Sequence, residues 1–162
     1  TNRGANRGGC AQICRWDFDL YSESKEKLEG EKEFTFCTKD LSNLKNIATQ
    51  TCAQIILTST WKYYISSLST EIGKMGTYLI QTFKHAGLQI SGYTEDIGCN
   101  RGQGIIDFLK QHPAESYVII DDQLFKDYEK LNLLSHLVLT NTKDGLTQEL
   151  AAKAVHILKK QS

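Results

Sequence analysis

The sequence predicts an α/β protein, a three-layer sandwich in which helices cover both faces of a mainly parallel sheet. Short apolar runs rich in β-branched residues alternate with longer segments whose apolar residues recur every three or four positions. The clearest strand is the continuous apolar run at residues 117–120, which suits a strand buried on both faces. A chain of 162 residues is long enough for one domain with a substantial core.

The same patterns place the individual elements. Strands are expected at residues 54–58, 88–91, 117–120 and 136–140. Helices are expected after a cap at Thr38, over residues 65–83, from Asn100 until just before Pro113, and after residues 145–147. In the second helix Gly73 and Gly76 mark a weak point, and Gly87 stands where a C-terminal glycine belongs.

Residues 1–16 are expected to form a flexible or partner-bound tail, followed by one domain over residues 17–162. The tail is polar and glycine-rich, and it carries Arg3, Arg7 and Arg15 without any acid. An arginine-rich, acid-poor start is also typical of processed organellar precursors.

Composition excludes several classes of protein. The formal net charge is zero, which argues against a broad nucleic-acid-binding surface but leaves a local patch open. No apolar stretch is long enough to cross a membrane. Five cysteines in no regular framework favour reduced thiols and an intracellular protein, cytoplasmic or mitochondrial.

The apolar run at residues 117–120 ends in two adjacent acids, Asp121 and Asp122. Neighbouring like charges at the end of a buried strand are unfavourable unless a positive group neutralises them. Magnesium, which binds through oxygen ligands, is a natural neutraliser at this edge of a parallel sheet. The alternative is a turn in which both acids face water.

Further polar groups stand at other strand ends and at a helix start. They are the acid pair Asp17 and Asp19, the hydroxyl cluster at residues 58–60, and Arg101. Because strand C-termini and helix N-termini share one rim of a parallel sheet, these groups can converge there with Asp121 and Asp122. Acids for magnesium, hydroxyls for phosphate oxygens and a cation suit phosphoryl transfer through an aspartyl-phosphate.

In their order and spacing these blocks resemble the haloacid-dehalogenase-like (HAD) domains, with a Rossmann-like sheet. The resemblance covers residues 34–158 and is closest to the small HAD domains of RNA-repair and polynucleotide-kinase-phosphatase-like proteins. The blocks that carry it are Ile55-Ile-Leu-Thr-Ser-Thr-Trp-Lys62, Gly92-Tyr-Thr94, Arg101 with Gly104-Ile-Ile, Tyr117-Val-Ile-Ile-Asp-Asp122, His136-Leu-Val-Leu and Gly145-Leu-Thr147.

The resemblance implies a role for each block. Thr58, with Ser59 beside it, would hold the transferred phosphoryl group, and Arg101, or Lys62 in its place, would steady the nucleophile and the phosphate. Asp121 and Asp122 would bind magnesium. The alternatives are a strand-end hydroxyl bonded to backbone for Thr58 and an exposed helix-start arginine for Arg101.

The first block of the family's pattern is the least well matched. In HAD phosphatases an Asp-x-Asp-Gly sequence directly follows an apolar strand; here Asp17-Phe-Asp19 is followed by Leu20, and the preceding segment at residues 12–15 is a poor buried strand. The resemblance makes Asp17 the nucleophile and Asp19 the general acid and base, and both would also bind magnesium. The alternative is an exposed acidic turn.

Two functions therefore stay open. One is a magnesium-dependent phosphomonoester hydrolase of HAD type, whose small or absent cap would leave room for bulky substrates such as nucleic-acid ends or proteins. The other is a catalytically inactive HAD-like domain that serves as a structural or binding subunit of a larger assembly, organellar assemblies included. Its protein partners would bind residues 1–16, which gain order only on binding.

Overall fold

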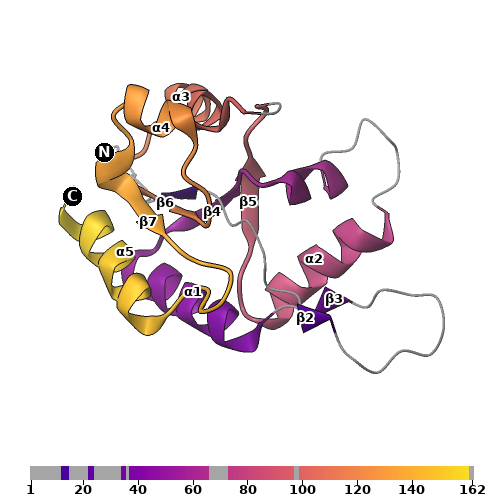
Figure 1. The fold of residues 1–162 in the computed structure, drawn as a ribbon. Coiled ribbons are helices and arrows are strands. Elements are labelled where there is room, and N and C mark those ends of the chain that lie inside the picture. Colours follow the sequence, from indigo (N-terminus) through magenta and orange to yellow (C-terminus); the bar gives the residue numbers. More distant parts are fainter. Residues whose placement is uncertain are drawn as a thin grey trace, which may run out of the picture.

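The structure is a computed structural model, and it describes residues 12–14, 22–23, 34–35, 37–65, 73–96 and 99–160, the first three ranges by their backbone alone. The strands are β1 (Gln12–Cys14), β2 (Ser22–Glu23), β3 (Phe34–Thr35), β4 (Gln54–Leu57), β5 (Ile90–Tyr93), β6 (Tyr117–Asp121) and β7 (Leu137–Leu139) (Figure 1). The helices are α1 (Thr38–Thr51), α2 (Lys74–His85), α3 (Arg101–Gln111), α4 (Lys126–Lys130) and α5 (Gln148–Lys160), with short 3-10 helices η1 (Thr60–Tyr64) and η2 (Leu134–His136). None of the described helices has the length and apolar character that crossing a bilayer requires.

Five strands form one parallel sheet in the order β5-β4-β1-β6-β7, and β2 pairs with β3 separately. The middle strand is β1, whose Cys14 is level with Ile56 of β4 and Ile119 of β6. From β1 the chain order runs outward to β4 and β5 on one side and to β6 and β7 on the other. The winding therefore reverses between β1 and β6, and open parallel sheets bind ligands at the carboxyl ends of strands beside such a reversal.

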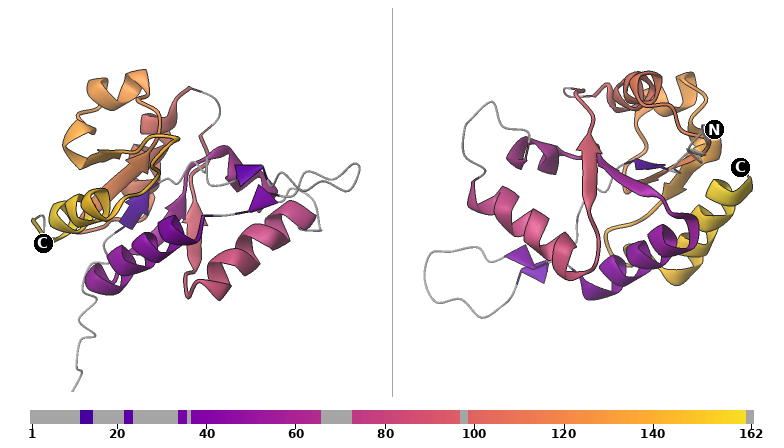
Figure 2. Two further views of the ribbon diagram at one scale, coloured as in Figure 1. Left: turned by 60° about the horizontal axis from the view of Figure 1, so that its bottom comes forward. Right: turned by 180° about the vertical axis from the view of Figure 1, so that it is seen from behind.

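Helices pack against both faces of this sheet (Figures 1 and 2). On one face α1, α2 and α5 bury apolar side chains together with Val118 and Ile120. On the other face Ile105 of α3 and Tyr128 of α4 pack with Ile119. Successive residues of a strand point to opposite faces, so the run at residues 117–120 serves both layers of the core. The predicted α/β class and parallel sheet are thus observed.

The middle strand lies in a segment that the sequence assigned to a tail. Residues 12–14 pair in parallel with both β4 and β6, although the expected boundary between tail and domain is at residue 17. The described part of this strand spans three residues of low apolar content, so the pattern of residues 12–15 gives little sign of a buried strand. The remaining residues of the expected tail lie outside the described ranges.

The helix expected over residues 65–83 is shorter than predicted. Ser59 and the chain after it form η1, residues 66–72 lie outside the described ranges, and α2 begins at Lys74 after an N-cap at Gly73. Gly73 itself has an extended backbone, so the helix predicted over residues 65–83 is interrupted there, as glycine's poor helix propensity suggests. The C-terminal prediction is confirmed: Gly87 has φ +74°, and Leu88 donates its backbone N–H to the carbonyl of Phe83 at 2.8 Å, a Schellman ending.

Helix α1 is fixed to the loop after β7 by a buried aspartate. Asp40 is 3% exposed, and its carboxylate accepts the backbone N–H of Leu146 at 3.0 Å. The side-chain amide of Asn43 donates to the Leu146 carbonyl at 2.7 Å. Burial raises the pKa of Asp40, only partly offset by Lys39 nearby and by the Leu146 hydrogen bond. The N-cap of α1 is Cys37 rather than Thr38, and no side chain caps it.

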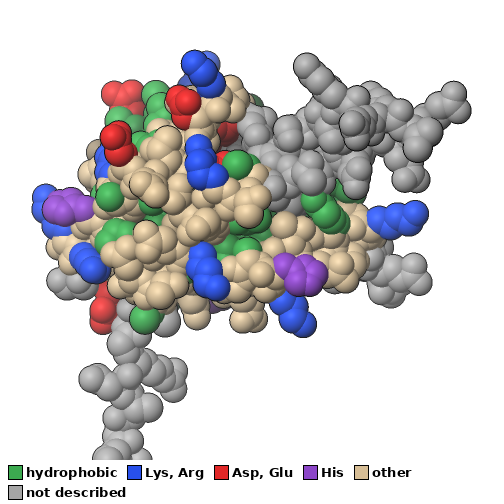
Figure 3. All heavy atoms as spheres, turned by 90° about the horizontal axis from the view of Figure 1, so that it is seen from below, with side chains coloured by type: hydrophobic (Ala, Val, Ile, Leu, Met, Phe, Trp, Pro, Cys, Tyr) green, Lys and Arg blue, Asp and Glu red, His purple; other side chains and the backbone are tan. Residues whose placement is uncertain are grey.

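The surface of the described residues is electrostatically mixed. On the face shown in Figure 3, Lys and Arg side chains lie apart from one another among neutral atoms, without a continuous basic patch. This distribution agrees with the zero net charge of the sequence. This face therefore offers no broad anion-binding surface.

Candidate functional site at the carboxyl edge of the sheet

Polar side chains gather where the parallel strands end. Thr58 follows β4, Thr94 follows β5, and Asp121 is the last residue of β6. Backbone hydrogen bonds continue the sheet just beyond the strands, since Thr94 donates its N–H to Leu57 at 3.1 Å and Thr140 donates to Asp121 at 2.8 Å. The predicted convergence of strand ends at one edge is therefore observed for the described strands.

Thr58 and Ser59 are both fully buried at this edge. The Ser59 hydroxyl accepts the backbone N–H of Trp61 at 3.3 Å and so caps η1. The Thr58 hydroxyl makes no hydrogen bond with any described residue. The alternative, a strand-end hydroxyl bonded to the backbone, is therefore not observed. A buried hydroxyl without a partner costs free energy, so the Thr58 hydroxyl is suited to donate to a ligand. Trp61 packs in the core, as expected.

Lys62 is buried and ion-paired rather than free in solvent. The side chain is 2% exposed, and its Nζ donates to Asp96 Oδ1 at 2.8 Å and to the Asp96 carbonyl at 2.7 Å. The hydroxyl of Thr94 donates to the same Oδ1 of Asp96 and lies 3.4 Å from Lys62 Nζ. This pair connects η1, after β4, with the segment after β5.

Arg101 starts α3 and meets the same carboxylate. It is only 6% exposed, so the alternative of an exposed helix-start arginine is wrong. Its Nε lies 3.8 Å from Asp96 Oδ2 but makes no hydrogen bond with a described residue. The guanidinium also stacks over the ring of Phe125, 5.1 Å from its centroid. Lys62 and Arg101, predicted as alternatives for one role, thus converge on one residue.

Asp96 fits this position because Gly104 of α3 has no side chain. A Cβ on Gly104 would lie 2.4 Å from Asp96 Cβ and Oδ1. The Asp96 side chain is 2% exposed, so two cations and one carboxylate are buried together. Buried charges need such partners, and among the described residues Lys62 and Arg101 share this one carboxylate.

The adjacent acids of β6 differ in their surroundings. Asp121 is 1% exposed; its Oδ1 accepts the backbone N–H of Gln123 at 2.8 Å and its Oδ2 accepts the hydroxyl of the fully buried Tyr128. A turn in which both acids face water is therefore excluded. Asp122 is half-buried. Its carboxylate is the more accessible of the two to a cation.

The donor chemistry at this edge fits magnesium in part. Asp121 and Asp122 supply the carboxylate oxygens that magnesium prefers. Within the described ranges, however, no group of three or more His, Cys, Asp or Glu side chains could hold a metal ion. Asp17 and Asp19, the other acids expected to bind magnesium, lie outside the described residues.

Sequence reasoning missed Asp96 and the whole of helix α4. Asp96 stands two residues beyond Thr94 at the end of a strand, a position that the reasoning applied to Asp121 could have singled out. Helix α4 spans five residues, too few for a clear period. Its side chains nevertheless support the site, since Tyr128 holds Asp121 and Asp127 accepts the backbone N–H of Gln103 at 3.0 Å at the start of α3.

The fold and the edge define a class of protein: an α/β domain with a five-stranded parallel sheet and a buried polar site at its carboxyl edge. The particular family follows from comparison with known proteins. A model of the family described as HAD domain in Swiss Army Knife RNA repair proteins matches residues 17–151. The chain belongs to this family, as the resemblance indicated.

Comparison with individual proteins adds less. The chain is similar to the tRNA hydroxylation protein P1 of Bacillus subtilis (strain 168), with 44% identity over 52 residues. The match covers 29% of this chain and 12% of that relative, so this chain spans only a small part of the relative's length. No solved structure matches the chain.

Proposed function

We propose that this chain is a magnesium-dependent phosphomonoester hydrolase of HAD type that acts through an aspartyl-phosphate on Asp17. The observation that carries the proposal is the position of β1 between β4 and β6, the place where the winding of the sheet reverses. Cys14 is level with Ile119 in this arrangement, and Asp17 and Asp122 each follow three residues later in the sequence. The finer description of the fold, a three-layer sandwich with little or no cap, belongs to the same proposal.

Two buried donors support an anion at this site. The Thr58 hydroxyl and the Arg101 Nε–H are both buried and make no hydrogen bond with a described residue. Each can donate to a phosphoryl oxygen, and the two buried cations Lys62 and Arg101 would offset the charge of a phosphate. Ser59 and Lys62 contribute to the proposed phosphate site mainly by fixing η1 and the segment after β5.

The chemistry would run in two displacements. A carboxylate oxygen of Asp17 attacks phosphorus, the bond to the leaving oxygen breaks, and Asp19 protonates that oxygen. Asp19 then takes a proton from water, whose oxygen attacks phosphorus and releases Asp17 and inorganic phosphate. Magnesium, held by Asp122 with Asp121, Asp17 and Asp19, would supply neutralisation of the phosphoryl oxygens.

The substrate class that we test first is a phosphorylated RNA end, because the family is described from RNA repair proteins. A site with little or no cap would admit such a bulky substrate. The test is magnesium-dependent release of phosphate from nitrophenyl phosphate and from an end-phosphorylated RNA oligonucleotide by the full chain.

We expect Asp17→Asn to lower kcat by at least about a thousandfold, because the amide oxygen is a poor nucleophile. Glu115→Gln, which neutralises an exposed acid in the loop before β6, is the matched control and should behave as the unaltered chain. Full activity in Asp17→Asn would remove Asp17 from its role.

One observation favours a second function, that of a catalytically inactive HAD-like domain that binds another chain through residues 1–16. Lys62 and Arg101 already share an internal anion, Asp96, which can substitute for a phosphate charge in a site that has lost its substrate. Under this alternative no substrate is hydrolysed, and removal of residues 1–11 abolishes association with the partner assembly.

A further inference from the structure

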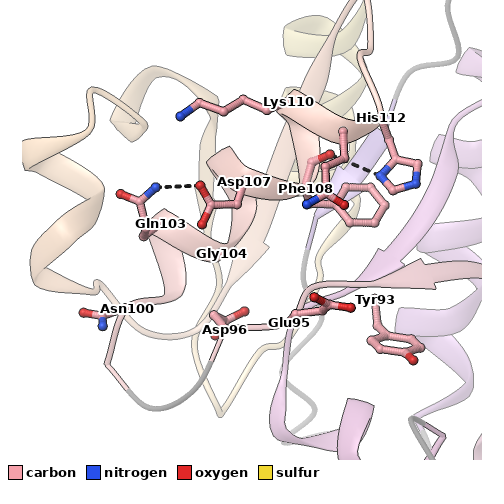
Figure 4. Close-up of a pocket in the computed structure, with 11 residues that line it drawn as sticks. Tyr93, Glu95, Asp96, Asn100, Gln103, Gly104, Asp107, Phe108, Lys110 and His112 are labelled. Atoms are coloured by element: carbon pink, nitrogen blue, oxygen red, sulfur yellow. Dashed lines mark hydrogen bonds between the residues drawn. The ribbon is translucent and has the colours of Figure 1, made fainter.

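A cavity of about 580 Å³ lies beside the proposed phosphate site, between α3 and the segment that follows β5 (Figure 4). Asp107 and Phe108 of α3 face Tyr93, Glu95 and Asp96 across it. Its volume is within the range of about 300 to 1,000 Å³ that is usual for small-molecule sites. A cavity of this volume is large enough for one nucleoside-sized group.

The cavity adjoins the buried cations through a shared residue. Asp96 lines the cavity, and its carboxylate is the one that Lys62 and Arg101 approach at 2.8 and 3.8 Å. A phosphoryl group bound to Arg101 would therefore have the rest of its molecule close to the mouth of this cavity. The non-phosphate part of a substrate is the natural occupant.

The lining combines aromatic rings with fixed hydrogen-bond acceptors. Tyr93 is 37% exposed, and Phe108 is half-buried and stacked against His112 with ring centroids 4.3 Å apart. The Asp107 carboxylate is held by the side-chain amide of Gln103 at 2.8 Å, as the dashed line in Figure 4 shows. An acceptor whose orientation is already fixed loses little entropy when a ligand donates to it.

The charge of the lining selects the kind of ligand. Asp96 is already paired with Lys62 and Arg101, so the charges that face a ligand from the described lining residues are the carboxylates of Glu95 and Asp107 and the ammonium group of Lys110. A second phosphate would be repelled, and a group with N–H donors would be favoured. Planarity suits the aromatic rings, since stacking on Tyr or Phe is favourable for any base.

We propose that this cavity binds the nucleobase of the substrate. The inference rests on the proposed function and extends it, because it places the recognition of the leaving group on α3 and at the end of β5. Amino and imino N–H groups of the base donate to Asp107 and Glu95, and the ring lies against Tyr93.

The test compares two substrates in the full chain and in two surface variants. Asp107→Ala removes the fixed acceptor in a helix where Ala is favourable, and Tyr93→Leu removes the ring while keeping apolar bulk. We expect each variant to lower the ratio of kcat/KM for an end-phosphorylated RNA oligonucleotide to that for nitrophenyl phosphate by about tenfold. Glu115→Ala, an exposed acid outside the cavity, should leave this ratio unchanged.

Different results separate this inference from the proposed function. Absence of hydrolysis of either substrate by the unaltered chain contradicts the proposed function. Unchanged ratios in both variants overturn the inference while the phosphatase stands. A third substrate, a phosphoserine peptide, is a further control. If Asp107→Ala lowers kcat/KM for this peptide as much as for the oligonucleotide, the inference is also overturned, because Asp107 would not be recognising a base.

A binding measurement tests the cavity without any catalysis. Nucleosides that lack a phosphate are titrated into the full chain and followed by NMR shifts of the backbone amides of Gln103, Asp107 and Phe108. We expect saturable shifts that weaken about tenfold in Asp107→Ala. Absence of shifts with all nucleosides overturns the inference, whether or not the chain hydrolyses phosphomonoesters.

Discussion

Two buried aspartates, Asp40 and Asp96, share much of their setting and differ in their partners. Each is almost fully buried, and each lies against a glycine whose Cβ would come within 2.4 Å of its side chain, Gly145 for Asp40 and Gly104 for Asp96. Asp40 accepts a backbone N–H, and its nearest cation is the exposed Lys39 at 4.0 Å.

Asp96, in contrast, is enclosed with two buried cations. Neither burial nor close packing against glycine therefore distinguishes a site from a structural clamp, because both aspartates have them. What distinguishes Asp96 is that two buried cations, Lys62 and Arg101, lie against it, whereas the cation beside Asp40 is exposed.

The largest effect is expected for Asp96→Asn, which removes the charge but keeps the shape. Loss of one partner of a buried ion pair costs about 3 to 5 kcal/mol of unfolding free energy, since Lys62 and Arg101 would stay buried without a carboxylate. Urea denaturation of the full chain measures the difference. Asp40→Asn should bring no such loss at neutral pH, because an amide oxygen can still accept the N–H of Leu146.

The same variant tests the role of Asp96 as an internal counter-ion. Without its charge, Lys62 and Arg101 should bind inorganic phosphate more tightly, by about tenfold, because the site gains one unit of positive charge. Isothermal titration measures this affinity, with Glu115→Gln as the charge-matched control. A stability loss with unchanged phosphate affinity would show that Asp96 only holds the fold.

A second pair of variants separates the two glycines. Gly104→Ala and Gly145→Ala should each lower stability by about 1 to 3 kcal/mol, because the new Cβ overlaps a buried carboxylate. At Gly104 this outweighs the gain of about 1 kcal/mol from better helix propensity. At Gly145 the positive φ of 61° adds backbone strain.

The two glycine variants should differ in their effect on phosphate binding. Gly104→Ala displaces Asp96 and with it the two cations, so phosphate affinity should change, whereas Gly145→Ala should leave phosphate affinity as it is. Gly73→Ala is the control for both, since a Cβ there meets nothing within 4 Å. Equal changes in phosphate affinity for Gly104→Ala and Gly145→Ala would contradict the distinction.

The limits of sequence reasoning are explained by the same residues. Strands 54–58 and 117–120 were predictable because β-branched runs buried on both faces leave a continuous apolar signal. The middle strand β1 was not, because its described residues, Gln12–Cys14, contain no continuous β-branched run. Thr58, Arg101 and Asp121 were predictable as strand-end or helix-start polar residues. The contacts of Asp96 were not predictable. Its partner Lys62 lies 34 positions away in the sequence, and Arg101 lies five positions away. The close packing of Asp96 also depends on Gly104, whose only contribution is the absence of a side chain.

The smallest effect is expected for Asp40→Asn and appears in the dependence of stability on pH. Burial raises the pKa of Asp40 in the folded chain above its ordinary value of 3.8, so the folded state binds the proton more tightly than the unfolded state. The contribution of Asp40 to stability is therefore full below pH 3.8 and is lost as pH rises through the raised pKa.

An asparagine at this position does not titrate, so the variant should lack this loss and become the more stable of the two at neutral pH, by about 1 kcal/mol or less. Unfolding free energies of both chains, measured from acidic to neutral pH, give the comparison. Because Asp96 has cations beside it, no such gain at neutral pH is expected from Asp96→Asn. A gain there would mean that Lys62 and Arg101 do not stabilise the buried carboxylate, and the contrast between the two aspartates would fail.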